Sequence, residues 1–394
     1  MSKFVVPFGG RSHVYTEDEI DLVAEIMRGT ESLTQGFRQK QLEKKFAQYI
    51  GISHAFAVTN ATSALELAAQ LCNIQSGDEV VVPAHTFTSS AYPFAKMGAN
   101  LVWADIDFHS RVMSSEHFKK CITSKTRVVI VPHLYGYGAD MPNIMDITKD
   151  RGILVIEDVA QAIGVEIEGK KAGSYGDISV YSFHAQKNIT SLGEGGMIGF
   201  TDDRYAEILP MIRHNGHCDF ASPRADYWLP AMGNVDLPEL EGNRIWPNNY
   251  CLSEIPCALA NRLLDRIETI NNEKRARAIR FIDRFSEYPE LVFHRENSSR
   301  HNYHLLAACL LNGQRDEFIR KMSVVYGIQC AVQYYPLNRY PFYERLGYGV
   351  ANCPNTDRFF DNMISFPFYH SLDDEQFEKV ILAGLSILDE SRNT

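Results

Sequence analysis

Lys187 lies where a lysine can be chemically reactive. It follows an apolar, strand-like run at 179–183 and precedes a glycine-rich stretch at 193–196. Open α/β folds bind ligands beyond the carboxyl ends of their strands. A lysine that is desolvated there loses part of its proton affinity, and its neutral amine then attacks carbonyl groups to form Schiff bases. Most lysines are solvated surface charges, so it is this position that predicts Lys187 as a nucleophile.

The acidic pair Glu157-Asp158 ends a second apolar run. An aspartate in this place is also a common helix N-cap, so the pair alone is equally typical of a helix start. The functional interpretation is a buried Asp158 carboxylate that keeps a proton on the ring nitrogen of a heterocyclic cofactor, because a protonated ring draws electrons more strongly.

Two further segments fit a phosphorylated, aromatic cofactor. Residues 59–63, Thr-Asn-Ala-Thr-Ser, join a strand to a helix, where free backbone amides and hydroxyls suit a phosphate group. Phe87 follows the strand-like run 79–82 and either packs in the core or stacks on a flat ring. Each signal is weak alone, because Ser and Thr cap many helices and strand ends are often aromatic.

The elements that would position these residues alternate along the first half of the chain. Short β-branched runs predict buried strands, and helical patterns fall between them. The strands are expected at 55–58, 79–82, 100–103, 127–131, 153–157, 179–183 and 197–200, and the helices at 61–71, 89–97 and 142–151. This alternation predicts an α/β fold with a large, mostly parallel sheet and helices on both of its faces.

A different pattern follows the last of these strands. Apolar positions at three- and four-residue spacing over 255–285 predict one long amphipathic helix, interrupted by a polar gap at 271–277. We therefore expect a large domain at 1–250 and, at 251–394, a linking helix with a small α+β domain. Residues 217–245 are rich in Pro, Gly and Asn and predict a long loop of functional importance.

Composition excludes several classes of protein. The 394 residues include 49 acidic and 39 basic side chains, a formal charge of −10, which argues against a nucleic acid partner. No apolar stretch approaches the ~20 residues of a membrane-spanning helix and no signal sequence stands out, so a cytoplasmic protein without membrane partners is expected. The eight cysteines form no C-x-x-C pair and the histidines show no metal-binding spacing, so we predict free thiols and no metal site.

The order and spacing of these motifs resemble the DegT/DnrJ/EryC/StrS family of sugar aminotransferases, which use pyridoxal 5'-phosphate on the aspartate-aminotransferase (type I) fold. The resemblance extends over nearly the whole chain. It rests on Leu-Thr-Gln-Gly at 33–36, Gly-Asp-Glu-Val at 77–80, Pro-His-Leu-Tyr-Gly at 132–136, Val-Ile-Glu-Asp at 155–158, Ser-Phe-His at 182–184 with Lys187, Asn-Tyr at 249–250 and Tyr-Pro-Leu at 335–337. The set is specific for the family and much less so for the substrate.

The resemblance implies roles for residues around the cofactor ring. Lys187 falls on the lysine that bonds the cofactor and then moves the proton. Asp158 falls on the partner of the ring nitrogen, Gln161 on the position that contacts the ring hydroxyl, and Phe87 on the stacking aromatic residue.

Other positions are implied around the phosphate and the partner subunit. Ala61 and Thr62 fall on the phosphate loop, with Ala where many members have Gly, and Ser182 falls on a second phosphate contact. His184 lies in the site near Lys187. Asn249 falls on the asparagine that reaches the partner's cofactor phosphate, so a homodimer with shared active sites is expected.

Three positions depart from the family pattern on the substrate side. Cys251 stands where many members have Arg, and Gln333 and Asn338 stand where many have His. These departures put the usual contacts to a nucleotide in question, but not the cofactor chemistry. Because each flanks a family motif, three arginines are candidate replacements: Arg213, Arg244 and Arg339.

The resemblance implies an aminotransferase that moves an amino group from glutamate to a nucleotide-linked keto-sugar, for cell-surface polysaccharide or aminosugar biosynthesis. Three alternatives stay open. One is the keto-sugar dehydratase branch of the family, which typically replaces the lysine with histidine, whereas Lys187 is present here. The others are an aminotransferase acting on a sugar without a nucleotide, and a regulatory relative without catalysis.

Overall fold

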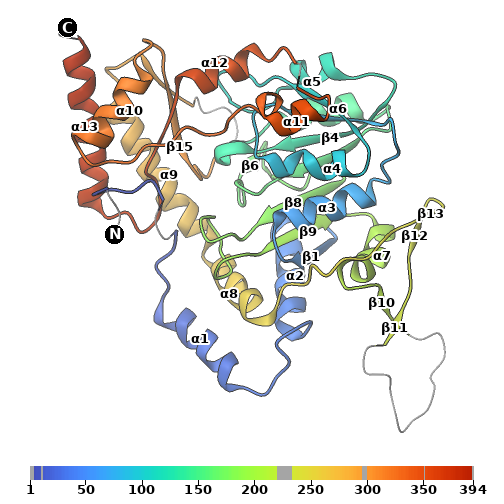
Figure 1. The fold of residues 1–394 in the computed structure, drawn as a ribbon. Coiled ribbons are helices and arrows are strands. Elements are labelled where there is room, and N and C mark those ends of the chain that lie inside the picture. The colour runs from blue at the N-terminus through green and yellow to red at the C-terminus, as the bar shows by residue number, and fades with distance from the viewer. Residues whose placement is uncertain (1–3, 10–11, 220–232, 295–299, 350, 393–394) are drawn as a thin grey trace.

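The computed structural model describes residues 4–9, 12–219, 233–294, 300–349 and 351–392. A seven-stranded sheet organises the larger part of the chain (Figure 1). In spatial order its strands are β1 (His54–Val58), β9 (Gly196–Phe200), β8 (Ile178–Ser182), β5 (Leu154–Asp158), β4 (Thr126–Pro132), β2 (Glu79–Pro83) and β3 (Asn100–Ala104). β9 runs antiparallel to both neighbours, and the other adjacent pairs are parallel. The predicted mostly parallel sheet is confirmed, and every predicted strand end lies within one residue of the observed end.

Successive side chains of the central strands belong to two different apolar cores. Val81 lies in one core, whereas Val80 and Val82 lie in the other. This alternation follows from the pleat of a strand, and it makes both faces of the sheet apolar. Helices cover both faces. α2 (Phe37–Ile50), α5 (Ser115–Cys121) and α6 (Met141–Thr148) contribute to the first core, and α3 (Ala61–Leu71), α4 (Tyr92–Lys96) and α7 (Asp203–Arg213) to the second.

The predicted single long helix is wrong. Two helices occupy this region, α8 (Glu254–Asp265) and α9 (Ile267–Arg284), and they meet at Arg266, whose backbone angles are not helical. The guanidinium of Arg266 binds Glu19 at 2.8 Å, in α1 (Glu17–Arg28). The helix therefore breaks at a point where the apolar spacing continues, so periodicity alone does not reveal the break.

A smaller unit lies at the other end of the molecule (Figure 1). Its antiparallel sheet consists of β14 (Leu291–Phe293), β15 (Leu306–Leu310) and β16 (Met363–Phe366). α10 (Arg315–Val324) and α13 (Asp374–Arg392) pack together beside it, and α12 (Pro354–Asn362) contacts β15. α11 (Pro341–Arg345) lies instead against the large sheet, because its Tyr343 belongs to the second core. The backbones of Val5 and Val6 bond to Gly327, so the start of the described chain joins this unit. The division at 250 and 251 stays a prediction.

The expected long loop is only partly described. Residues 220–232 lie outside the described part of the chain. The flanking segments form two short hairpins, β10 (His217–Cys218) with β11 (Asn234–Val235), and β12 (Glu239–Leu240) with β13 (Asn243–Arg244). A third short hairpin joins β6 (Glu166–Ile167) to β7 (Lys170–Lys171). Across the residues that the structure covers, no helix is both long and apolar enough to cross a membrane.

Candidate active site

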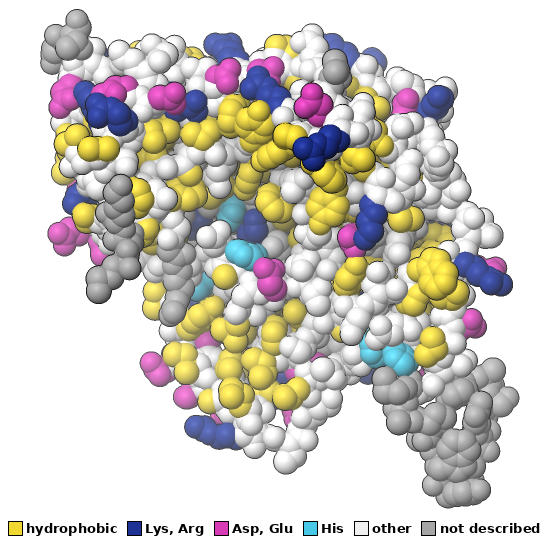
Figure 2. All heavy atoms as spheres, in the orientation of Figure 1, with side chains coloured by type: hydrophobic (Ala, Val, Ile, Leu, Met, Phe, Trp, Pro, Cys, Tyr) yellow, Lys and Arg dark blue, Asp and Glu magenta, His cyan; other side chains and the backbone are white. Residues whose placement is uncertain are grey.

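A cavity of about 450 Å³ lies at the carboxyl edge of the large sheet. This volume is within the range of small-molecule sites. Its lining includes eight of the nine predicted site residues: Ala61, Thr62, Phe87, Asp158, Gln161, Ser182, His184 and Lys187. We call this space the cofactor cavity. Figure 2 shows a hollow with histidine side chains near the middle of the displayed face.

Lys187 follows β8 in a tight turn. Its backbone amide donates to the carbonyl of His184 at 2.8 Å, and its own carbonyl lies 3.0 Å from Nε2 of His13. Burial lowers the pKa of the Lys187 amine to about 8, and the nearby Asp158 carboxylate opposes that shift. A larger share of neutral amine is thus present near neutral pH than for an ordinary lysine.

The two acidic residues at the end of β5 face different surroundings. Glu157 is fully buried, binds Nε2 of His133 at 3.0 Å and accepts three backbone amides from the loop 173–176. Asp158 lines the cofactor cavity, where its Oδ2 accepts a 2.7 Å hydrogen bond from Ser90. Consecutive strand residues point to opposite faces, so one carboxylate supports the fold and the other faces the site.

The start of α3 is built to leave its amides facing the cavity. Asn60 is the N-cap, and its Oδ1 accepts from the backbone of Ser63 at 2.8 Å. Gly196, at the start of β9, allows this close approach. A Cβ on Gly196 would lie 2.6 Å from the carbonyl carbon of Asn60 and 2.7 Å from the nitrogen of Ala61. These contacts are to backbone and leave no room for a side chain, which explains the glycine.

An aromatic wall closes one side of the cofactor cavity. Phe87 is 51% exposed and packs edge-on against Tyr334, with ring centres 6.0 Å apart. Gln161 connects this wall to the chain beyond β4. Its Nε2 donates to the hydroxyl of Tyr334 at 2.9 Å, and its Oε1 accepts from the amide of Tyr135 at 2.7 Å. The exposed face of the Phe87 ring is free to stack on a flat ligand.

Ser182 and His184 line the wall on the β8 side. Ser182 is buried, and its hydroxyl accepts a 3.3 Å hydrogen bond from the amide of His184. The His184 ring lies 3.8 Å from the carboxylate of Glu194, which also lines the cavity. A hydroxyl, an imidazole and a carboxylate thus face the same space.

Asn249 is the one predicted site residue that does not line this cavity. It is exposed and forms an isolated backbone bridge with His214. Among the three departures from the family pattern, only Gln333 lines the cavity. Cys251 bridges to the backbone of Val58, and Asn338 is buried with its Nδ2 3.4 Å from the carbonyl of Ala351.

The three arginines considered as replacement contacts lie elsewhere. None of them lines the cofactor cavity. Each pairs with an acidic side chain of its own chain: Arg213 with Glu43 at 2.5 Å, Arg244 with Glu239 at 3.3 Å, and Arg339 with Asp357 at 2.5 Å.

Tyr334, in the cofactor cavity, and Lys274 are among the lining residues that were not predicted from the sequence. Tyr334 follows Gln333, one of the three departures from the family pattern, and no sequence motif indicates that Tyr334 lines the site. Lys274 lines a smaller cavity that also contains Lys187. A signal for it was present, because the polar gap at 271–277 interrupts the apolar face of α9. Within this gap Asn271 and Lys274 are buried, whereas Asn272, Glu273 and Ala276 are exposed.

Relatives and solved structures match the chain over most of its length. The spore coat polysaccharide biosynthesis protein SpsC of Bacillus subtilis is 30% identical, over 92% of this chain and 94% of its own. The GDP-perosamine synthase of Vibrio cholerae is also 30% identical, over 86% and 88%. The PMP form of the putative sugar aminotransferase Spr1654 from Streptococcus pneumoniae superposes with a TM-score of 0.85 at 25% identity, covering 97% of this chain and 99% of its own.

The model of the DegT/DnrJ/EryC1/StrS aminotransferase family matches residues 14–383. The match includes the whole sheet, the cofactor cavity and most of the smaller unit, and the solved structures share this α/β fold. Aminotransferases of this family use pyridoxal phosphate, in agreement with the PMP form of Spr1654. The chain therefore belongs to the DegT/DnrJ/EryC1/StrS family and is a pyridoxal phosphate-dependent sugar aminotransferase.

Proposed function

We propose that this enzyme transfers the amino group of glutamate to a nucleotide-linked keto-sugar that is used in polysaccharide or aminosugar biosynthesis. The observation that carries the proposal is the meeting of Lys187 and Asp158 in one cavity of suitable size. The relatives named GDP-perosamine synthase and SpsC support a nucleotide-linked sugar and a polysaccharide product, respectively.

The residues present fit pyridoxal phosphate. The first amides of α3, at Ala61 and Thr62, suit the phosphate because a helix N-terminus attracts anions. The hydroxyl of Thr62 lies 2.9 Å from that of Ser89, so two hydroxyls are available beside those amides. Ser182 lines the same cavity and is proposed as a further phosphate contact.

Asp158 is proposed to hold the cofactor's ring nitrogen in its protonated form. When bound, pyridoxal phosphate supplies an electron sink for the carbon that gains or loses the amino group. The bond from Ser90 fixes the orientation of the Asp158 carboxylate. Phe87 would stack on one face of the ring, and Gln161 would contact the ring hydroxyl from the amide that now meets Tyr334.

Lys187 is proposed as the catalytic residue. Its amine first holds the cofactor and, once released, moves a proton at the reacting carbon. A pKa of about 8 suits both tasks, because an acid–base group works best when its pKa is near the working pH. His184 lines the same cavity and is proposed to contact the ligand there.

A homodimer is proposed as the active unit, in the cytoplasm. Asn249 lies exposed and outside the cofactor cavity of its own chain, which supports a role toward the partner's site. Twofold dimers are also the commonest symmetric assembly. Sedimentation tests this proposal, and a fully active monomer would contradict it.

An assay of purified enzyme with pyridoxal phosphate, L-glutamate and a panel of nucleotide-linked keto-sugars tests the activity. We expect one sugar to become aminated and 2-oxoglutarate to form in equal amount. The glutamate step can be followed alone through the visible absorbance of the bound cofactor. Glutamate consumption without amination of any sugar in the panel would contradict the nucleotide-linked substrate, and no reaction with any amino acid would contradict the proposal as a whole.

A titration with free nucleoside diphosphates separates nucleotide-linked from unlinked sugars. The three candidate arginines already pair with acidic residues, so we expect their Ala variants to keep the nucleotide affinity of the wild type. No binding of any nucleoside diphosphate to the wild type would favour a sugar without a nucleotide.

A further inference from the structure

A second, smaller cavity of about 90 Å³ adjoins the cofactor cavity. The two share Lys187, His184, Gln186, Gln333 and Tyr334 in their linings. The smaller one, which we call the inner cavity, extends to residues from distant parts of the chain: Phe8, Ser12, Lys274, His304 and Phe368. A ligand that reaches the Lys187 amine in the cofactor cavity can therefore also extend into the inner cavity.

Lys274 brings a buried positive charge to the inner cavity. The residue is 7% exposed, its ammonium donates to the carbonyl of His304 at 3.0 Å, and it lies 5.1 Å from the centre of the Phe368 ring. Burial lowers the pKa of Lys274 to about 7, and the cations Arg277 and Lys187 lower it further. In the described part of the chain, no carboxylate forms an ion pair with it. A buried cation of this kind is stabilised by an anion.

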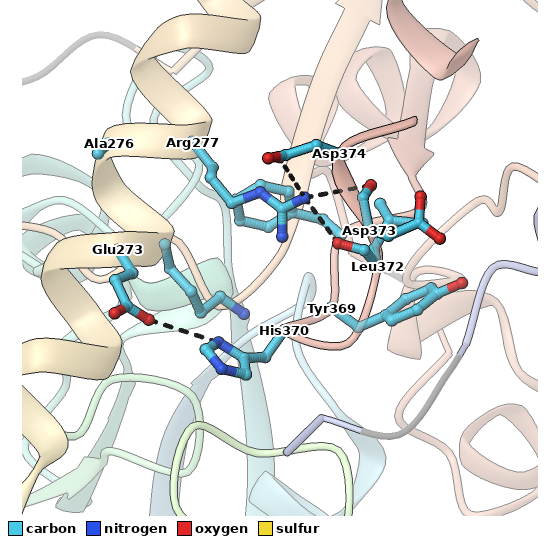
Figure 3. A pocket seen from close by; sticks show the side chains of 10 residues that line it. Glu273, Ala276, Arg277, Tyr369, His370, Leu372, Asp373 and Asp374 are labelled. Atoms are coloured by element: carbon cyan, nitrogen blue, oxygen red, sulfur yellow. Dashed lines mark hydrogen bonds and ion pairs between the residues drawn. The ribbon is translucent and has the colours of Figure 1, made fainter. Parts of the chain in front are cut away.

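The acidic side chains near Lys274 have other partners. Figure 3 shows a neighbouring pocket of about 430 Å³ between α9 and the start of α13, which Lys274 also lines and which we call the outer pocket. There Glu273 faces His370 at 3.8 Å, and Asp374 lies 3.6 Å from the guanidinium of Arg277. The Arg277 side chain also donates to the carbonyl of Leu372 at 2.7 Å.

The buried histidines near Lys274 carry no positive charge at neutral pH. Burial lowers the pKa of His13 to about 4 and that of His304 well below its ordinary value, so both imidazoles are neutral at pH 7. His370 lines the outer pocket, and burial also lowers its pKa. Lys274 is the lysine of the inner cavity that is not proposed to hold the cofactor, so its ammonium is available to a ligand there.

We propose that the inner cavity binds a carboxylate of the amino-acid donor, with Lys274 as its positive partner. This inference rests on the proposed function. An amino-acid donor always carries a carboxylate next to its amino group, whereas a keto-sugar needs none. The donor's nitrogen has to reach the place of the Lys187 amine, and the inner cavity begins there. The inner cavity, at about 90 Å³, has room for a group the size of a carboxylate.

Lys274→Met tests the proposal, because it removes the charge and keeps an unbranched apolar side chain. The variant is loaded with pyridoxal phosphate and titrated with L-glutamate, and the visible absorbance of the cofactor is followed. Loss of a charge-assisted contact should raise the half-saturating glutamate concentration roughly ten- to a hundredfold. The step in which the pyridoxamine phosphate enzyme reacts with the keto-sugar should keep its rate within about threefold.

Arg277→Met is the matched control. It removes a cation one turn further along α9, from a residue that lines the outer pocket but not the inner cavity. Its glutamate titration should match the wild type within about threefold. Lys274→Arg, which retains the charge, should recover much of the affinity that the Met variant loses. Unfolding temperature and cofactor absorbance of all variants show whether they are folded and loaded.

Calorimetry with succinate gives a readout without turnover, because this dicarboxylate has no amino group to transfer. We expect the Lys274→Met variant to bind succinate at least about tenfold more weakly than the wild type. A folded Lys274→Met variant with wild-type saturation by glutamate and wild-type succinate binding would overturn the inference alone. A wild-type enzyme that reacts with no amino acid would overturn the proposed function and the inference together.

Discussion

The cofactor cavity and the inner cavity share Lys187 but are built from the chain in different ways. Most walls of the cofactor cavity follow the ends of adjacent strands in one sheet, between residues 60 and 194. The inner cavity is assembled from the chain start, α9, the segment before β15 and residues 333–334. The reactive groups are thus positioned by a single rigid sheet, and the groups we assign to the donor by segments that must first pack together.

The largest expected effect is at the residue common to both cavities. Lys187→Ala should reduce turnover by at least about a thousandfold, because proton transfer by a positioned group contributes roughly 10²–10⁴ in rate and the amine also holds the cofactor. The phosphate contacts at α3 should still retain pyridoxal phosphate. Activity assays and cofactor content measure the two effects, and near-native activity would disprove the assignment.

Adjacent carboxylates allow a sharper test of the sheet edge. Asp158→Asn should reduce activity about a hundredfold or more and leave the unfolding temperature nearly unchanged, because the site loses the charge that faces the ring nitrogen. Glu157→Gln should do the reverse, because Glu157 accepts three backbone amides and binds His133 in the interior. Thermal unfolding and steady-state rates of the two variants show which carboxylate serves catalysis and which supports the fold. If Asp158→Asn leaves the activity little changed, Asp158 is only a structural cap.

A smaller effect is expected from Gly196→Ala. The added methyl group would meet the backbone of Asn60 and Ala61 and push the start of α3 away from β9. Overpacking of this kind costs about 1–3 kcal/mol, so we expect pyridoxal phosphate to bind roughly tenfold more weakly. Gly29→Ala is the matched control, because Gly29 also lacks a positive φ and its Cβ would make only ordinary contacts at 3.5 Å. Unchanged cofactor affinity in Gly196→Ala would contradict the proposed phosphate site.

The pH dependence of cofactor attachment should be the smallest effect. Only the neutral Lys187 amine reacts, and its lowered pKa of about 8 places the change near that pH. Between pH 7 and 8 the rate of reconstitution of the cofactor-free enzyme should rise about fivefold and then level off. A free lysine analogue, with its pKa near 10.4, should keep rising about tenfold per pH unit. Reconstitution that keeps rising beyond pH 9 would disprove the lowered pKa.

Much of the fold and of the cofactor cavity could be predicted from the sequence, because buried parallel strands are short apolar runs and their ends carry the site. Strand periodicity alone could not say which of Glu157 and Asp158 faces the cavity. The break at Arg266 was hidden because the apolar spacing continues across it. Lys274 was passed over because a polar gap in a helix is usually a solvated face, and only tertiary packing buries Lys274 and Asn271 within this one.

The pairing of Val5 and Val6 with Gly327 has a practical consequence for protein engineering. Val6 is fully buried, and Phe8 and Ser12 form part of the inner cavity wall. A deletion of the residues up to and including Ser12 would therefore have two effects. It would remove backbone contacts of the smaller unit, and it would open the inner cavity beside Lys187. Affinity tags and immobilisation chemistry are better attached behind α13, whose last turn is exposed and lines none of these cavities.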